Sequence, residues 1–464
     1  MRQSTFSTPI AYALTLSFFL FVSGIFGKSH AQQTKATELL KSRNAEFQKD
    51  IVHVTDNVYT SVGHTVSTVS MIVGTDGVII IDTGMSTSAA EEILSEFRNI
   101  SQKPIKGIIY THGHGDHTGG ASIFAKEDDP EIWARDNIKQ ESETLKEAGL
   151  TIQAIRGARQ GGFKLPPEQR INNGIAPAVY PNRGGEAFEG GSGYLPPTHT
   201  FSTNREVVEI AGVQLELVAA GGETYDQLYV WYPEGKVVFS GDNFYKSWPN
   251  LYAIRGVPYR DVLDWADATD RMLKEGPEYL VPGHTRPVLG EQEVTRLLTD
   301  YRDAIRFVFD KTIEGMNKGL TPDELVDYVQ LPEELASKDY LREYYGNIEW
   351  GVRSIFTGYL GWFNGNPTEL FSLHPADEAA KMADLAGGQQ QLLVKAQQAL
   401  KEGEYQWAAQ LSDHLIALDK DAKEPKLIKA NALTELANEL LTATGRNYYL
   451  TVARELRQEA QSTQ

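Results

Sequence analysis

The apolar residues follow two patterns in the first part of the chain. From Ile51, short runs rich in valine, isoleucine and threonine alternate with turn residues, as is typical of β-strands. Asp76-Gly77 separates two such runs and predicts a hairpin, and the second run, Val78 to Ile81, is apolar throughout, like a fully buried strand. Ser86 to Ile100 instead repeats apolar residues at helical spacing. This mixture predicts an α/β domain.

The middle of the chain continues this pattern with one long interruption. Residues 121–150 are expected to be helical, whereas residues 155–200 are rich in glycine, proline and asparagine. Loops of that length within a domain are usually functional lids or disordered, and we predict that this one covers the substrate. Strands resume with the runs REVVEI, VQLELVAA, LYVWYP and KVVFSGD.

From Tyr259 onwards the pattern is helical, apart from the strand-like run YLVPGH at residues 279–284. Residues 321–370 are rich in aromatic side chains. Residues 378–464 contain pairs of helical runs whose Ala, Leu and Gly-x-Tyr spacing resembles a tetratricopeptide unit. The alternative for this last stretch is an ordinary helical bundle without a partner. We expect packing or dimerisation in preference to the binding of another protein.

The N-terminal residues differ in composition from the rest. Arg2 is followed by an apolar run from about Ile10 to Phe26 and then by small residues up to Ala31. This pattern predicts a secretory signal over residues 1–31, with cleavage after Ala31, and a retained membrane anchor is the alternative. A polar lead-in follows at residues 32–50. No later stretch approaches a membrane span, so no stable membrane insertion is expected after cleavage.

The chain contains no cysteine, and acidic residues outnumber basic ones. An exported protein without disulfides fits a bacterial periplasm or exterior, and thiol ligands and thiol nucleophiles are excluded. The formal net charge of −18 becomes −20 once the two positive charges of Arg2 and Lys28 leave with the signal. This excess argues against nucleic-acid partners, and an anionic substrate would need a local positive patch.

The strongest chemical signal is the run IKGIIYTHGHGDHTGG at residues 105–120. It places His112, His114, Asp116 and His117 in a glycine-rich loop after a strand-like run. Four such side chains cannot converge from a regular helix or strand, but glycine permits the turns that bring them together. Imidazole and carboxylate donors suit Zn²⁺, and suit iron or manganese less well. The run therefore predicts a metal site.

This spacing resembles that of the metallo-β-lactamase superfamily of hydrolases. The resemblance implies an αββα sandwich and two adjacent metal ions, one bound by His112 and His114, the other by Asp116 and His117. Asp82 stands at the end of its strand as the superfamily's strand-end aspartate does. It is expected to support the ligands without binding metal itself, and a simple turn cap is the alternative.

The resemblance also implies three further ligands, each after an apolar run: Glu223, Asp242 and His284. Asp242 is expected to bridge the two metals, and His284 to complete the second site. Most of the superfamily has histidine where this chain has Glu223, and glutamate at that position resembles the linear alkylsulfatase family. The similarity extends over residues 50 to 460, through the runs NLYAIRG, TRPVLG, LREYYGNIEWGVRSIFTGYLGWFNGNPTEL, YQWAAQLSDHLIAL and RNYYLTVARELR.

The resemblance to alkylsulfatases implies both the organisation and the reaction. A catalytic αββα domain is expected over residues 51–320 and an all-α, tetratricopeptide-like dimerisation domain over residues 321–464, in a homodimer. The implied reaction cleaves an alkyl sulfate monoester to an alcohol and inorganic sulfate, by hydroxide formed from water between two Zn²⁺ ions. The sequence ends at Gln464 without the sterol-carrier-like domain that fuller members of the family carry.

The expected catalytic residues are Asp116 and Arg255. Asp116, together with Asp242, is expected to orient the attacking water. Arg255, in an Ile-Arg-Gly segment, is expected to bind the sulfate group, as in the family, because a guanidinium offers two parallel donors to an oxyanion. The alternative for Arg255 is a structural ion pair with Asp261 or Asp264.

Two departures from the family lie near the expected leaving group. The bridging carboxylate is the shorter Asp242, and the loop after it, NFYKSWPN, lacks the family's histidines. The role of those histidines is therefore either vacant or taken by Tyr245 or Lys246, which are the residues expected to contact the substrate there. Tyr225 is a weaker candidate near the pocket, and Arg260 is expected to be structural.

Two other classes of function fit the same residues less well. Another hydrolase of this fold, acting on an ester, thioester, lactone, β-lactam or phosphodiester, would keep the metals and change the pocket. The other alternative is a partner-binding protein with a structural metal. Structural zinc sites are closed by four protein ligands around one ion, so two bound ions would favour hydrolysis.

Overall fold

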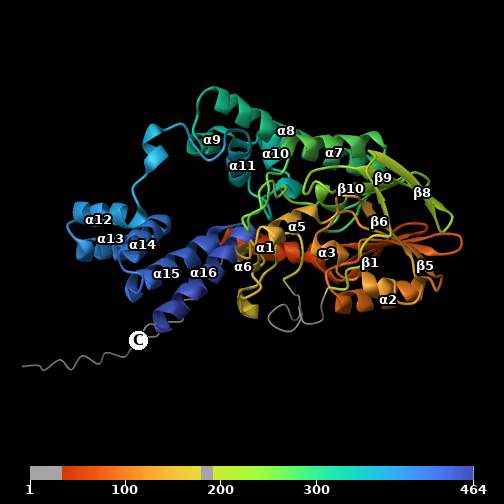
Figure 1. The fold of residues 1–464 in the computed structure, drawn as a ribbon, viewed down its shortest axis with the longest axis horizontal. Coiled ribbons are helices and arrows are strands. Elements are labelled where there is room, and N and C mark those ends of the chain that lie inside the picture. Colours follow the sequence, from red (N-terminus) through yellow and green to blue (C-terminus); the bar gives the residue numbers. More distant parts are fainter. Residues whose placement is uncertain (1–33, 179–191, 463–464) are drawn as a thin grey trace, which may run out of the picture. The chain divides into compact units, whose positions relative to one another are not determined.

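The computed structural model describes residues 34–178 and 192–462. The predicted signal over residues 1–31 lies outside the described residues, as does the middle of the predicted loop over residues 155–200. In the described part, two β-sheets lie face to face with helices on their outer faces (Figure 1).

The first sheet has seven strands in sequence order: β1 (Asp50–Thr55), β2 (Val58–Val62), β3 (Val69–Val73), β4 (Val78–Ile81), β5 (Ile105–Ile109), β6 (Glu131–Arg135) and β7 (His199–Phe201). Strands β1 to β4 pair antiparallel, and β4 to β7 pair in parallel. The hairpin predicted at Asp76-Gly77 joins β3 to β4 and is confirmed.

The second sheet has the order β13-β12-β11-β10-β9-β8. Its strands are β8 (Arg205–Ile210), β9 (Val213–Ala219), β10 (Leu228–Tyr232), β11 (Val237–Phe239), β12 (Tyr279–Val281) and β13 (Val288–Leu289). Neighbours pair antiparallel, except that β11 and β12 are parallel. The four strand-like runs predicted after residue 200 are confirmed as β8 to β11.

Apolar side chains hold the layers together. Ile79 of β4 and Val230 of β10 belong to one buried cluster between the two sheets. Helix α2 (Thr87–Ile100) covers the outer face of the first sheet, where its Phe97 packs in a cluster with Ile80. Helices α7 (Val262–Lys274) and α8 (Glu291–Asn317) cover the second sheet. The αββα sandwich implied by the resemblance is therefore confirmed.

Parallel strand pairs bring distant parts of the chain to common edges of the sheets. Because parallel neighbours end at the same edge, Asp82 after β4 lies beside the glycine-rich loop after β5. In the second sheet, the parallel pair β11 and β12 brings Asp242 and His284 together in the same way.

Three elements differ from the sequence prediction. Strand β6 lies within the stretch that was expected to be helical, between the short helices α4 (Ala121–Phe124) and α5 (Gln140–Glu147); a further short helix, α3 (Gly115–Thr118), precedes that stretch. The short strands β6 and β7 are stabilised by parallel pairing, which the local pattern does not show. Helix α6 (Ile152–Gln160) begins the stretch that was expected to be an irregular loop.

The remaining elements are helical. They are α1 (Lys35–Ser42), η1 (Arg43–Phe47), η2 (Pro167–Gln169), η3 (Gly241–Asn243), α9 (Pro322–Tyr328), α10 (Glu333–Ala336), η4 (Asp339–Leu341), α11 (Ile348–Leu360), η5 (Pro367–Phe371), α12 (Pro375–Ala386), α13 (Gln389–Glu402), α14 (Tyr405–Leu418), α15 (Lys423–Glu439) and α16 (Ala443–Ser462). Helices α12 to α15 pack around one apolar cluster, in agreement with the predicted helix pairs. Within residues 34–178 and 192–462, none of the helices has both the length and the apolar character needed to cross a bilayer.

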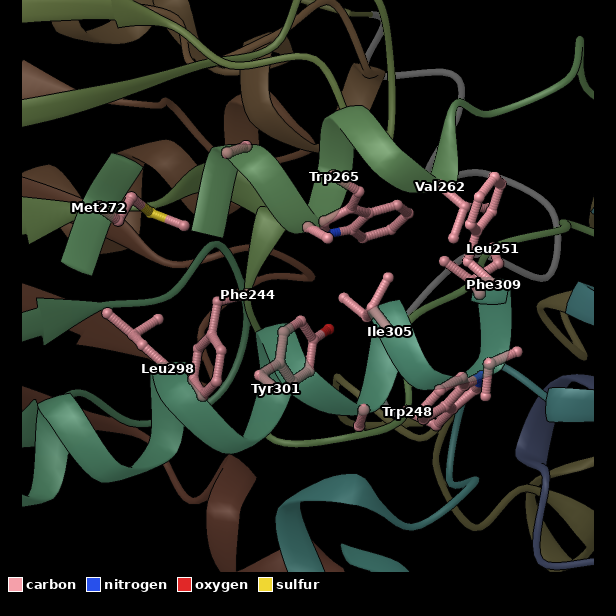
Figure 2. Close-up of a cluster of buried hydrophobic side chains, with 14 of the residues drawn as sticks. Phe244, Trp248, Leu251, Val262, Trp265, Met272, Leu298, Tyr301, Ile305 and Phe309 are labelled. Atoms are coloured by element: carbon pink, nitrogen blue, oxygen red, sulfur yellow. The ribbon is translucent and has the colours of Figure 1, made fainter. Parts of the chain in front are cut away.

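The expected boundary at residue 320 does not separate two cores. Phe309 of α8 and Ile355 of α11 belong to the same buried cluster as Trp265 of α7. Figure 2 shows Trp265 and Phe309 with their neighbours between α7 and α8. The described residues from Thr34 onwards accordingly form one compact unit, and α11 is part of the layer that covers the second sheet.

Ile355→Ala tests this shared core. The Ile355 side chain is fully buried, so its truncation should leave a cavity and lower the free energy of unfolding by about 2–5 kcal/mol. We expect one unfolding transition, followed together by circular dichroism and tryptophan fluorescence, to move to lower denaturant concentration. Leu150→Ala, at a half-exposed leucine, is the control that should move it little. A second transition that stayed at the wild-type midpoint would indicate two independent cores.

Candidate active site

Asp82 fastens the glycine-rich loop to the end of β4. Its Oδ1 accepts a hydrogen bond from the Thr111 backbone N–H (2.8 Å), and its Oδ2 accepts one from the Thr111 hydroxyl (2.9 Å). The same Oδ2 lies 2.7 Å from Nδ1 of His117. Asp82 has a φ of +56°, which non-glycine residues rarely adopt, so these contacts hold it in a strained conformation. Asp82 therefore orients both the loop and His117, whereas a simple turn cap would contact only the backbone of the turn.

His117 presents its second nitrogen to the other candidate ligands. Nδ1 lies against the Asp82 carboxylate, so Nε2 faces the other candidate ligands, as in metal-binding histidines that have a carboxylate behind them. Nε2 lies 3.2 Å from Asp242 Oδ1 and 3.8 Å from Asp116 Oδ2, yet it is buried without a hydrogen bond.

His112 and His114 place two further nitrogens at the same point. His112 Nε2 lies 2.9 Å from His114 Nδ1 and 3.7 Å from Asp242 Oδ2. Burial lowers the pKa of both imidazoles well below the ordinary histidine value, and neighbouring histidines add to the effect. The neutral imidazole, which burial favours, is the form that binds a metal ion.

Asp242 and His284 close the cluster from the second sheet. His284 Nε2 lies 3.2 Å from Asp242 Oδ2 and 3.7 Å from Asp116 Oδ2. Burial by itself would raise the pKa of Asp242, but the neighbouring histidines hold it well below its usual range, so the carboxylate stays ionised. A side chain at Gly283 would collide with Asp242 Oδ1, so glycine is needed for this close approach.

The donor atoms form three overlapping groups, and within each group they lie within 4.8 Å of one another. The groups are His112, His117 and Asp242; Asp116, His117 and His284; and His114, Glu223 and Asp242. Buried imidazole and carboxylate atoms without hydrogen bonds, such as His117 Nε2, Glu223 Oε2 and Asp242 Oδ1, fit divalent cations. The structure thus brings together every metal ligand expected from the sequence. Asp242 belongs to two groups, as a bridging carboxylate would.

Glu223 is held by Arg260, which leaves one carboxylate oxygen free. Glu223 Oε1 forms a buried ion pair with Arg260 (2.7 Å), and Oε2 has no hydrogen-bond partner. Burial raises the pKa of Glu223 to about 7, and the positive charge of Arg260 opposes that rise. Arg260 also donates to the Asn250 carbonyl (2.6 Å), so its contacts are structural, in line with the sequence expectation.

Arg255 reaches the metal-ligand cluster. Its Nη2 lies 3.3 Å from His114 Nε2. The alternative ion pairs are not formed, because Asp261 accepts hydrogen bonds from the start of α7 and Asp264 pairs with Arg271 (3.3 Å). The guanidinium is therefore a positive charge beside the candidate metal site, and none of the described carboxylates forms an ion pair with it.

Tyr245 lies beside the cluster, with its ring centroid 6.1 Å from that of His284, whereas Lys246 extends to the polar lead-in. Tyr245 is fully buried, and its hydroxyl accepts a hydrogen bond from the Asn250 backbone N–H (2.7 Å). Lys246 forms an ion pair with Glu46 (3.1 Å), which lies in the polar lead-in. The Tyr245 hydroxyl accepts from the backbone and the charge of Lys246 is paired with Glu46, and a substrate contact by either side chain stays a prediction.

Tyr225, the weaker candidate, is exposed at the surface, where its hydroxyl donates to the Tyr259 carbonyl (2.7 Å). Its hydroxyl proton is thus donated to a main-chain carbonyl, and its ring lies at the surface.

Tyr345 is a residue that the sequence analysis missed. Burial raises its pKa, and the charges of Glu223, Arg255 and Asp116 are close enough to act on it as well. The phenol therefore stays neutral near the cluster and can donate a hydrogen bond. Its run, LREYYGNIEWG, carries the family resemblance, but its place beyond residue 320 hides its relation to the site.

Comparison with known proteins agrees with this fold and cluster. Residues 62–284 match the sequence model of the metallo-β-lactamase superfamily, and residues 321–459 match that of alkyl sulfatase dimerisation. A linear primary-alkylsulfatase from a Pseudomonas species is 36% identical over 395 residues, which cover 83% of this chain and 73% of that protein. An (R)-specific secondary-alkylsulfatase from Pseudomonas is 30% identical over 420 residues, 88% of this chain and 62% of that protein.

A solved structure extends the likeness to the whole fold. The stereoselective inverting sec-alkylsulfatase from Pseudomonas superposes with a TM-score of 0.82 at 28% identity, over 91% of this chain and 67% of that one. The sandwich and its His/Asp/Glu cluster define a hydrolase of the metallo-β-lactamase superfamily. Within that superfamily the chain belongs to the alkylsulfatases, which are sulfuric ester hydrolases.

Asp82→Asn tests how the metal ligands are supported. The amide keeps the size of the side chain but removes the charge that orients His117, so we expect zinc affinity to fall by about 10- to 100-fold. Zinc titration against a competing chelator measures this change. Asp76→Asn, at an exposed aspartate paired with Lys106, is the matched control and should leave the affinity unchanged. Wild-type affinity in Asp82→Asn would reduce Asp82 to a turn cap.

Proposed function

We propose that this protein uses two Zn²⁺ ions to hydrolyse alkyl sulfate monoesters, so that one ester and one water give an alcohol and hydrogen sulfate. The observation that carries the proposal is the position of Arg255, whose guanidinium lies 3.3 Å from the candidate ligand His114 without a carboxylate partner among the described residues. A positively charged group that can donate two parallel hydrogen bonds beside a candidate metal site is suited to bind a sulfate group.

The side chains around the cluster supply the remaining roles. Bound divalent cations would lower the pKa of a water towards neutrality and so make a nucleophile available without a side-chain base. Asp116 and Asp242 can accept hydrogen bonds from that water and orient it. Arg255 can hold two sulfate oxygens and so fix the ester against the nucleophile.

His114→Ala should abolish sulfate release from dodecyl sulfate by the zinc-loaded protein, because it removes a ligand that lies between the metal cluster and Arg255. Free sulfate measured by ion chromatography gives the rate, and removal of zinc by a chelator should have the same effect. His53→Ala, at an exposed histidine of β1, is the matched control and should keep wild-type activity.

The same protein also tests the alternative functions. If the zinc-loaded wild type released no sulfate, the substrate class would be wrong, and carboxylic esters, lactones, β-lactams and phosphodiesters would be assayed next. Metal analysis separates the remaining alternative: one tightly held zinc per chain would favour a structural site, and two favour hydrolysis.

We also propose that the chain forms a homodimer through its C-terminal helices. The region that matches the dimerisation model carries large apolar side chains at its surface, including Trp362 (71% exposed) and Phe371 (95% exposed). Exposed aromatic groups of this size are typical of protein interfaces.

Light scattering tests the dimer at several concentrations. We expect twice the mass of one chain for the wild type, and Phe371→Ser should shift the equilibrium towards monomer because it removes exposed apolar surface. Leu150→Ser, another exposed apolar residue outside the matched region, is the control and should stay dimeric. A wild type that is monomeric at every concentration would contradict the proposal.

Export to the periplasm or exterior of a bacterial cell is a further proposal, supported by the signal-like pattern of residues 1–31 and by the absence of cysteine. The N-terminus of the exported protein, determined by mass spectrometry, should be Gln32. An intact Met1 would indicate a retained anchor.

A further inference from the structure

Helix α6 holds the backbone on both sides of Arg255. The Gln153 side-chain amide donates to the Gly256 carbonyl (2.6 Å), and the Arg156 guanidinium donates to the Ile254 carbonyl (2.6 Å). Gln160 Oε1 accepts a hydrogen bond from the Arg255 backbone N–H (3.1 Å). The spacing of three and four residues puts these side chains on one face of the helix, so α6 acts as a clamp on this turn.

The Arg255 side chain runs along the same helix. A Cβ added at Gly157 would lie 3.8 Å from Arg255 Cδ, so the arginine stem passes close to the α6 backbone. The turn ends at Gly256, whose φ of +94° only glycine adopts readily. The direction of the guanidinium therefore depends on where α6 holds the turn.

Gln160 is the buried member of the clamp, with 6% of its surface exposed. Its side chain contacts the backbone amide of Arg255 itself, whereas Gln153 and Arg156 hold the flanking carbonyls. A buried amide that gives its oxygen to a loop N–H makes a contact that water cannot easily replace.

Helix α16 fixes α6 from the other side. The Asn447 side chain donates to the Gln160 carbonyl (3.4 Å), Arg159 forms an ion pair with Glu455 (2.7 Å), and the Arg454 guanidinium donates to the Lys164 carbonyl (2.6 Å). The C-terminal helix thus supports the helix that clamps Arg255.

We propose that Gln160 is a positioning residue for substrate binding, which sets the Arg255 guanidinium against the sulfate group by holding the Arg255 backbone N–H. The inference rests on the proposed function, because it assumes that Arg255 binds sulfate. Gln160 touches no reacting atom. Its loss should therefore weaken binding of the sulfate group in the ground state and the transition state alike.

Gln160→Met removes the acceptor and keeps the length of the side chain. We expect KM for dodecyl sulfate and the inhibition constant for inorganic sulfate to rise about tenfold, with kcat changed less than about twofold. Gln160→Glu restores an acceptor oxygen and should recover most of the affinity. Gln398→Met makes the same chemical change on the exposed face of α13 and should match the wild type.

A binding measurement without turnover completes the test. Inorganic sulfate should raise the melting temperature of the zinc-loaded wild type, and this rise should shrink in Gln160→Met and in Arg255→Ala. If Arg255→Ala kept the wild-type response to sulfate, the proposed anion site itself would be wrong. If Arg255→Ala lost the response while Gln160→Met kept both the response and the wild-type KM, only the role of Gln160 would be overturned. A fall in kcat at unchanged KM in Gln160→Met would also overturn it.

Discussion

Much of this structure is arranged around one electrostatic constraint, the burial of candidate metal-ligand atoms that have no hydrogen-bond partner among the described residues. His117 Nε2, Asp242 Oδ1 and Glu223 Oε2 converge in the interior in this condition. Each such atom costs about 1–3 kcal/mol when it is left unsatisfied, and bound cations would offset that cost. Neighbouring charged groups hold the ligand side chains in place. Asp82 orients His117, and Arg260 pairs with one oxygen of Glu223 and leaves the other free.

Both sheets bring these side chains together at the ends of parallel strands. In the first sheet the loop after β5 carries candidate ligands and the end of its parallel neighbour β4 carries the supporting Asp82, and in the second sheet the parallel pair β11 and β12 ends in Asp242 and His284. The helical region then stabilises what the sheets assemble. Helix α11 packs into the core over the second sheet, and α16 supports α6, which holds the turn that carries Arg255. A region matched to dimerisation therefore also shapes the site within its own chain.

The parts that the sequence predicted are those set by local pattern or by a contiguous motif. The ligands of the HGHGDH loop, the hairpin at Asp76-Gly77 and strands β8 to β11 are of this kind. Strand β6 escaped prediction because its stability comes from neighbours on both sides in the sheet, and Tyr345 escaped because it reaches the site from beyond the expected boundary. Tyr245 and Lys246 were expected at the substrate from their position in the chain. The ring of Tyr245 lies beside His284, whereas Lys246 is paired with Glu46 of the polar lead-in.

The sequence by itself indicated a candidate metal site, because donor type and glycine spacing within the loop restrict what can bind there. The layered fold was implied by the resemblance of its motifs to the metallo-β-lactamase superfamily, and the strand and helix patterns agree with it. Only the tertiary structure decided which charges stand alone and which are paired. Among the described residues Arg255 has no carboxylate partner, whereas Arg260 is paired with Glu223 and Lys246 with Glu46, although all three are basic residues in one short stretch of the chain. Their partners come from remote segments, and ion pairs and hydrogen bonds form only where packing brings such segments within reach.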